Sequence, residues 1–153
     1  MYISAGVWAV DTTGGVWFRT GLSTGEDTVQ AWLSVHQPTT DFIKFRDITA
    51  AAGGSIWGVD TKNTVYVRTG VKATLPVGLS WEHVPGIQCL HVCADQDGAL
   101  GVSTSHHVVF RYGVGPGLPA GNYWRKIPGP PPDGSTKLLT MLPDRGLWCA
   151  SNR

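Results

Sequence analysis

The fold of this chain is decided by residues 55–71, which read Ser55-Ile-Trp-Gly-Val-Asp-Thr-Lys-Asn-Thr-Val-Tyr-Val-Arg-Thr-Gly-Val71. Two short runs rich in β-branched and aromatic residues flank a central Asp-Thr-Lys-Asn-Thr segment. Such runs favour strands, and the residues between them favour a turn. The pattern therefore predicts a β-hairpin.

The same pattern recurs along the chain. Residues 7–22 contain Val-Trp-Ala-Val-Asp and Val-Trp-Phe-Arg-Thr-Gly-Leu, and residues 100–114 contain Leu-Gly-Val-Ser and Val-Val-Phe-Arg-Tyr-Gly-Val. Successive copies lie 49 and then 43 residues apart, and one later tryptophan in each copy keeps both spacings. These tryptophans are Trp32, Trp81 and Trp124. Residues 147–151 begin a fourth copy. Since several anchors agree at common offsets, the chain contains a true internal repeat.

The repeat has the length of a β-propeller blade. Each unit is expected to hold four short strands within 43–49 residues. The strands carry apolar residues on both faces, because Trp57 and Val59 would lie on one side and Ile56 on the other. Stacked blades bury both faces of a sheet, whereas a lone sheet with one face in water usually has polar residues on that face. We therefore expect an all-β fold of propeller blades, each with four antiparallel strands.

The chain is expected to contain three full blades plus part of a fourth, in a single β-propeller segment over residues 1–153. The repeats are placed approximately at 1–48, 49–92, 93–141 and 142–153, the last being partial. A closed ring usually needs roughly 4–8 blades. We therefore expect the chain to be part of a longer array, and the alternative is that several chains complete a ring together.

Composition argues against several classes of function. The net charge is +1 and 15% of the residues are charged, with the lysines and arginines scattered singly. Nucleic-acid binding would need a basic stripe, so no nucleic-acid partner is expected. No apolar run reaches about 18 residues, which predicts no membrane span. The first residues lack the pattern of a secretory signal, which favours a cytoplasmic location, with secretion as the alternative.

The repeated elements resemble those of the tectonin β-propeller repeat family. They are, in order, Trp-Gly-Val-Asp, Val-Tyr-Val-Arg-Thr-Gly-Val, Gly-x-Ser-Trp and Val-Pro-Gly, all within residues 55–86. Residues 7–32 and 99–129 also match well, so the resemblance covers nearly the whole chain. The third unit departs from the pattern, with Leu100 in place of the hairpin tryptophan and Ser103 in place of the aspartate.

The resemblance implies one of two functions. Secreted or surface tectonins and the fish-egg lectin-like proteins bind glycans, whereas large intracellular tectonin-repeat proteins are scaffolds in autophagy and vesicle trafficking. Because the sequence lacks a signal and a disulfide framework, we expect the second function. The chain would then be a non-catalytic scaffold that binds protein partners of the trafficking and autophagy machinery and reaches membranes only through them. The alternative is a carbohydrate-binding lectin of the tectonin type.

One arginine recurs at the same position of each hairpin, and these candidate binding residues are Arg19, Arg68 and Arg111. In a binding role they would form a ring of donors for sugar hydroxyls or partner carboxylates. In a structural role each guanidinium would pack on an aromatic ring or bond to carbonyls of a neighbouring blade. A residue that every repeat retains is more often structural, so the structural role is favoured.

No pattern for catalysis, a metal or a cofactor is found. The sequence has no nucleophile elbow and no phosphate-binding loop. Cys89, His91 and Cys93 alternate on an expected strand and would share one face, but they would spread over roughly 13 Å, too far for one metal. We expect buried, reduced cysteines and no enzyme activity.

The segment 124–127 also fits a loose Trp-x-x-Ile adaptor motif, but it coincides with a repeat strand and should already be paired.

Overall fold

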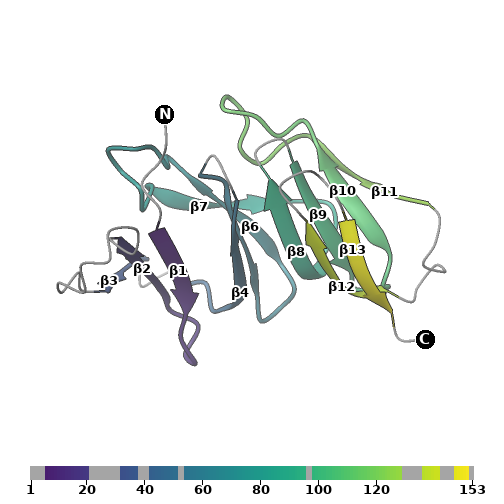
Figure 1. Ribbon diagram of the computed structural model, residues 1–153, viewed down its shortest axis with the longest axis horizontal. Coiled ribbons are helices and arrows are strands. Elements are labelled where there is room, and N and C mark those ends of the chain that lie inside the picture. The colour runs from purple at the N-terminus through teal and green to yellow at the C-terminus, as the bar shows by residue number, and fades with distance from the viewer. Residues whose placement is uncertain are drawn as a thin grey trace.

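The structure of the chain, shown in Figure 1, is a computed structural model. It describes residues 6–20, 32–37, 42–51, 54–95, 98–128, 136–141 and 147–151. Within these ranges the chain forms strands and turns and no helix. The strands pair into four antiparallel sheets, and each sheet is built from strands that follow one another in the sequence. The prediction of an all-β fold is confirmed.

The four sheets follow one another along the chain. The first contains β1 (Gly6–Val10), β2 (Val16–Thr20) and β3 (Leu33–Ser34). The second contains β4 (Phe45–Ala50), β5 (Ile56–Asp60), β6 (Val65–Thr69) and β7 (Ser80–Val84). The third contains β8 (Cys89–Asp95), β9 (Gly98–Ser103), β10 (Val108–Tyr112) and β11 (Tyr123–Lys126). The fourth contains β12 (Thr136–Met141) and β13 (Leu147–Ser151).

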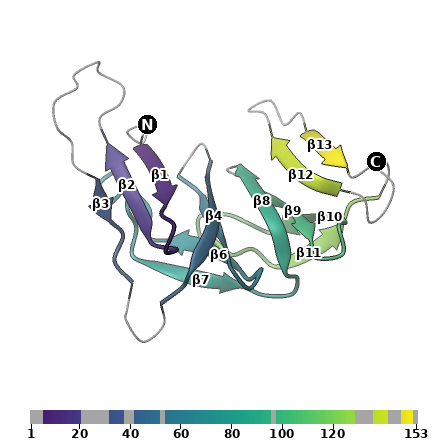
Figure 2. The same ribbon diagram turned by 90° about the horizontal axis from the view of Figure 1, so that it is seen from below.

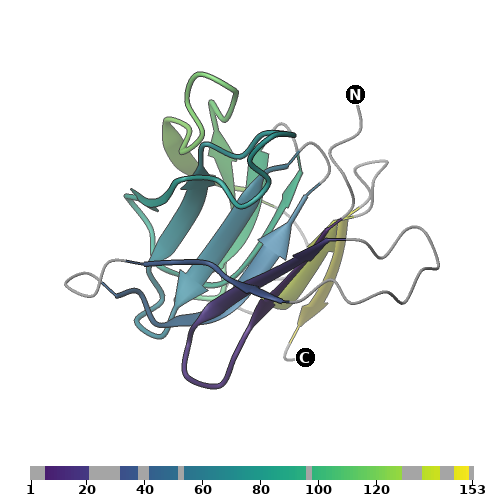
Figure 3. The same cartoon turned by 90° about the vertical axis from the view of Figure 1, so that its left-hand side faces the viewer.

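The sheets are arranged as propeller blades. The first strand of the third sheet, β8, contacts the first strands of its two neighbours, β4 and β12, and Figure 2 shows these strands toward a common centre. The last strands, β7 and β11, lie farther out. Figure 3 shows the first sheet lying across the face of the second. The second and third sheets have four strands each, as predicted for blades. The sequence also predicts the end of a strand at residues 1–6, of which residues 1–5 lie outside the described ranges.

The sheets divide the chain at points that differ from the expected repeat boundaries. β4 pairs with β5 and β8 pairs with β9, so the strand expected to close each repeat opens the next sheet instead. The boundaries after residues 48 and 92 therefore fall inside β4 and β8. A periodic sequence defines the length of the repeat, but it does not define the residue at which a sheet begins.

The spaces between the first three sheets are filled by apolar side chains. Between the second and third sheets, Trp57 is fully buried (0% exposed), and its ring centre lies 6.5 Å from that of Trp124 in an edge-on arrangement. Between the first and second sheets, Phe18 packs in one cluster with Phe45 and Trp81. Both faces of the second sheet are therefore buried, which explains why its strands are apolar on both sides.

Two glycines make room for side chains of the adjacent strand in their own sheets. A Cβ on Gly58 would lie 2.5 Å from the ring of Phe45, and a Cβ on Gly101 would lie 2.8 Å from Sγ of Cys89. Phe45 and Cys89 are the first residues of β4 and β8, so the two pairs occupy equivalent positions. Glycine is needed here for close packing.

A β-bulge interrupts the first strand of the second, third and fourth sheets directly after its first residue. In β8 the register shifts between Cys89 and His91. Because a bulge adds one residue, the side chains beyond it change face. Cys89 therefore packs with Trp57, whereas Cys93 packs with Leu100 on the opposite face. The expectation that Cys89, His91 and Cys93 share one face is wrong, because it assumed a regular strand.

The repeated hairpin has its turn between β1 and β2, between β5 and β6, and between β9 and β10, and each of these turns contains a residue in the left-handed conformation. These residues, with φ angles of 89°, 65° and 62°, are Gly14, Asn63 and His106. The carbonyl of each accepts a hydrogen bond from the amide that opens the following sheet. The donors, at distances of 3.1, 2.9 and 3.2 Å, are Phe45, Cys89 and Thr136. The left-handed turn residue therefore ties each sheet to the next one.

Replacing Asn63 by valine tests this connection. A residue with a Cβ branch is strained in the left-handed region by roughly 1–2 kcal/mol, so Asn63→Val should lower the free energy of unfolding by at least about that amount. Asn63→Gly is the matched control, because it also removes the 2.6 Å hydrogen bond from Arg46 to Asn63 Oδ1 but permits the conformation. Urea denaturation measures both, and equal stability of the two variants would contradict the role given to the turn.

Thiol labelling tests the position of Cys89. Burial raises the pKa of Cys89 to about 12, and the thiolate is the reactive form of cysteine. At pH 8 we therefore expect Cys89 to resist a thiol reagent in the folded protein and to react after unfolding in urea. Mass spectrometry of the labelled peptides gives the result. Rapid labelling of Cys89 in the native protein would show that the space between the second and third sheets is open.

Candidate functional site

Two of the three repeated arginines occupy equivalent buried sites. Arg68 is 6% exposed and donates from Nε to the carbonyl of Val77 at 2.7 Å. Arg111 is 3% exposed and donates from Nε to the carbonyl of Ala120, also at 2.7 Å. Each guanidinium lies over the tryptophan of the last strand in its sheet, 5.3 Å from the Trp81 ring and 5.6 Å from the Trp124 ring. Burial lowers the pKa of both arginines, but from so high a value that both stay charged at neutral pH.

These arginines hold the loops that follow their strands against the preceding blade. Val77, in the loop after β6, packs between the first and second sheets, and Ala120, in the loop after β10, packs between the second and third. Arg111 also donates from Nη1 to the carbonyl of Pro85, directly after β7, at 3.1 Å. The third blade is thereby joined to the second, and the guanidinium donors are taken up by carbonyls of the chain.

Arg19 has the corresponding place in β2 of the first sheet. Its Nε is buried and has no hydrogen-bond partner among the residues that the structure describes. The loop that would correspond to those after β6 and β10 falls in residues 21–31, outside the described ranges. A ligand-binding role for Arg19, Arg68 and Arg111 stays a prediction, whereas the contacts of the latter two belong to the fold.

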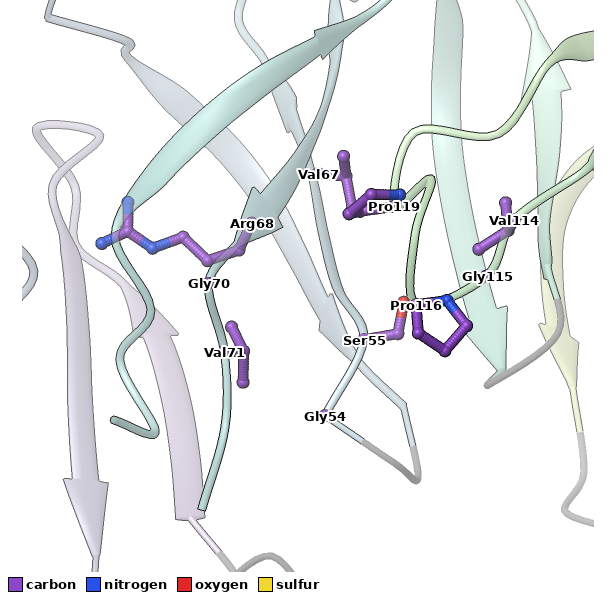
Figure 4. A pocket seen from close by; sticks show the side chains of 10 residues that line it. All are labelled: Gly54, Ser55, Val67, Arg68, Gly70, Val71, Val114, Gly115, Pro116 and Pro119. Carbon is purple, nitrogen blue, oxygen red and sulfur yellow. The ribbon is translucent and has the colours of Figure 1, made fainter. Parts of the chain in front are cut away.

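A cleft of about 540 Å³ lies between the second and third blades, at the end opposite the hairpin turns. One wall comes from the start of β5 and the end of β6, and the other comes from the loop after β10 (Figure 4). The residues lining it are Gly54, Ser55, Val67, Arg68, Gly70, Val71, Val114, Gly115, Pro116 and Pro119. In Figure 4 the Val67 side chain points toward Pro119, whereas the guanidinium of Arg68 points to the other side of the strand.

The cleft offers an apolar surface with few polar side-chain groups. Its walls are formed by valine and proline side chains and by glycine backbone. The hydroxyl of Ser55 already accepts a hydrogen bond from Trp57 Nε1 at 2.8 Å. With the Arg68 donors directed elsewhere, the cleft suits an apolar group better than a charged one. The residues that line it include no histidine, lysine, cysteine or carboxylate that could serve as a general base beside Ser55.

Sequence reasoning did not find this cleft, although one signal for it was present. Residues 75–78 read Leu-Pro-Val-Gly and residues 118–121 read Leu-Pro-Ala-Gly, 43 residues apart. Both loops close with an isolated β-bridge, and the glycine of each has a positive φ angle, 66° at Gly78 and 67° at Gly121. The repeated loop motif therefore indicated a repeated loop shape, which forms the wall of the cleft.

The other candidates from the sequence have the following outcomes. Within the described ranges, no three histidine, cysteine or acidic side chains lie close enough to hold a metal ion. The expectation that the segment from Trp124 is already paired is confirmed, because β11 pairs with β10 and the Trp124 ring packs against Trp57. Among all the residues that the structure describes, no helix is long and apolar enough to cross a membrane.

The blades, the repeated arginine contacts and the inter-blade cleft define the chain as a β-propeller repeat protein. The model of the tectonin domain matches residues 1–104 and, in a second match, residues 39–140. The chain therefore belongs to the tectonin family, as its resemblance predicted. This family's fold is typically non-catalytic and suggests a lectin-like, protein-binding role. No curated protein matches the chain significantly.

Replacing Arg111 by methionine tests the structural role of the repeated arginine. The change keeps much of the side-chain volume but leaves the carbonyls of Pro85 and Ala120 without their donor. Ala120 is buried whereas Pro85 is exposed to water, and one unsatisfied buried group costs about 1–3 kcal/mol. Arg111→Met should therefore lower the free energy of unfolding by about 1–3 kcal/mol. Arg125→Met, at an exposed arginine of β11, is the control and should change stability by less than about 0.5 kcal/mol. Similar urea midpoints for both variants would show that Arg111 does not support the fold.

Proposed function

We propose that the chain is a non-catalytic interaction scaffold that binds protein partners through the cleft between the second and third blades. The observation that carries the proposal is the apolar character of the cleft, whose walls include Val67, Val71, Val114 and Pro119. Its volume of about 540 Å³ falls within the range of roughly 300–1,000 Å³ that is typical of ligand pockets. An aliphatic or aromatic side chain of a partner would bury its surface there.

The polar groups of the cleft favour a protein partner over a glycan. A sugar needs several directed hydrogen bonds to its hydroxyls, and buried hydroxyls left unsatisfied oppose binding. Here Ser55 is engaged by Trp57, and Arg68 is engaged by the carbonyl of Val77. An apolar side chain needs none of these donors, so the cleft suits it without rearrangement.

The partners are proposed to belong to the intracellular membrane-trafficking and autophagy machinery. Support for this comes from the tectonin family and its intracellular branch. The buried Cys89 thiol is in keeping with a reducing compartment, which supports the cytoplasm as the place of action.

A tectonin-type lectin is the second candidate. The observation that favours it is a pair of exposed tyrosines on the third blade, Tyr112 and Tyr123, which are 37% and 52% exposed and whose rings stack with 5.3 Å between their centres. Exposed aromatic rings can pack against the apolar face of a sugar. This surface lies on β10 and β11 and is separate from the residues that line the cleft.

Two glycines of one loop provide a matched test. A Cβ at Gly115, which lines the cleft, and a Cβ at Gly117, which does not, would each meet nothing within 4 Å. Gly115→Glu should therefore place a charge in the cleft without disturbing the fold, and Gly117→Glu should place the same charge outside it. We expect proteins captured from cytosol by the wild type to be retained at least tenfold better by Gly117→Glu than by Gly115→Glu, as quantified by mass spectrometry.

The same proteins on a glycan array separate the two candidates. Saturable binding that free sugar competes, with no effect of Gly115→Glu, would support the lectin and refute the scaffold. Capture that depends on Gly115 and shows no response to sugar supports the scaffold. Enrichment of trafficking or autophagy proteins among the Gly115-dependent partners tests the cellular role.

A further inference from the structure

The fold gathers cationic side chains that are scattered in the sequence. The turn end of the propeller comprises the hairpin turns at 11–15, 61–64 and 104–107, the segments that open β4, β8 and β12, and residues 127–128. The exposed cations there are Lys44, Arg46, Lys62 and Lys137. In Figure 1 the turns of the first two sheets lie along the lower edge, away from the loops that form the cleft.

Hydrogen bonds link the segments that carry these residues. The carbonyl of Lys44 accepts from the amide of Thr61 at 3.0 Å, directly beside Lys62. The carbonyl of Lys62 accepts from Gln88 Nε2 at 3.2 Å, which reaches the start of the third sheet. The amide of Thr136, next to Lys137, donates to the turn of the third sheet. The segments that carry the cations are therefore linked in a row that runs from the second sheet through the third to the fourth.

Two carboxylates at this end, Asp11 and Asp60, accept hydrogen bonds from their own turns. Asp11 accepts from the amide of Thr13 at 2.8 Å and from Trp17 Nε1 at 2.8 Å. Asp60 is 7% exposed and accepts from the amides of Lys62 and Thr64, both at 2.8 Å. These groups face the backbone of their own turns, so they offset the lysines only in part.

Arg46 adds a charge that neutral groups hold in place. Its Nη1 donates to Asn63 Oδ1 at 2.6 Å and its Nη2 donates to the carbonyl of Leu90 at 2.6 Å. The nearby Asp47 forms an ion pair with His91 at 3.1 Å. The guanidinium is thus fixed between the second and third blades, and no carboxylate of the described residues forms an ion pair with it.

Two large apolar side chains are exposed at the same end. Phe42, two residues before Lys44, is 54% exposed, and Ile127, whose amide donates to the carbonyl of Val108 beside the third turn, is 37% exposed. An acidic peptide would be attracted by the cations, but its binding would not require the exposed apolar side chains. An anionic membrane attracts the cations to its headgroups and also accepts apolar side chains into its interface.

We propose that the turn end binds an anionic membrane surface directly, with Lys44, Lys62 and Lys137 at the headgroups and Phe42 in the interface. The cleft lies at the opposite end of the same blades, so a membrane at the turn end leaves it accessible. The inference does not depend on the proposed function, since it uses none of the residues that line the cleft.

Co-sedimentation of the full chain with vesicles tests the charges. Vesicles of phosphatidylcholine with added phosphatidylserine should bind the protein, vesicles of phosphatidylcholine alone should not, and salt should weaken the binding. Each lysine near an anionic surface contributes about fivefold, so the double variant Lys44→Ala, Lys62→Ala should bind about 25-fold more weakly. The control is Lys72→Ala, at an exposed lysine in the loop after β6. This loop belongs to the loop end, the end of the blades opposite the turn end, and the variant should bind as the wild type does. The side chains replaced make no hydrogen bond within the described residues, and far-UV circular dichroism checks that the fold persists.

A second pair of variants tests the apolar contact. Phe42→Ala should weaken binding to the anionic vesicles at least threefold, whereas Leu79→Ala, at a 72% exposed leucine of the loop end, should have no effect. The proposal is overturned by absent binding, by equal binding to both vesicle types, or by equal losses for the turn-end and loop-end variants. It is also overturned if soluble poly-glutamate binds with the same lysine dependence while the vesicles do not, because the partner would then be an acidic peptide.

Discussion

One backbone hydrogen bond, repeated at each junction, organises the propeller. The amide that opens each new sheet donates to the carbonyl of the left-handed turn residue in the sheet before it, as Cys89 does to Asn63. Because the donor is the first residue of a first strand, the bond sets where the new sheet starts against the old one. The bulge that follows then determines which side chains of that strand face the preceding blade and which face the next.

The apolar faces and the arginines act within this arrangement. Sheets that lie side by side bury both of their faces. Trp57 and its neighbours are therefore removed from water although the described part of the chain contains no helix. Arg68 and Arg111 then fold the loops back over the preceding blade. The cleft between the second and third blades results from this, because one of its walls is a loop held in place by Arg111.

Much of the fold could be predicted from the sequence, and the failures have specific physical causes. The spacing of Trp32, Trp81 and Trp124 and the two-sided strands predicted stacked four-stranded sheets. The bulge was missed because period-two alternation treats β8 as regular, so Cys93 was assigned to the wrong face. The cleft was missed because it joins residues from separate repeats, Ser55 and Pro116, which only the packing of two blades brings together. Repetition favoured a structural role for the arginines, but it did not predict their contacts, since spacing does not show where a guanidinium points.

The glycines beneath Phe45 and Cys89 have a consequence for the identity of each blade. The second sheet combines an aromatic ring with Gly58, whereas the third combines a small thiol with Gly101, although the backbones at these positions are equivalent. Similar repeats in one chain risk exchanging places as they assemble. Phe45 enters the cluster between the first and second sheets, and Cys89 enters the cluster between the second and third, so side chains of different bulk fill these two spaces. Exchanging the second and third blades would therefore pair surfaces of unequal volume, although the backbone contacts of the two blades are alike.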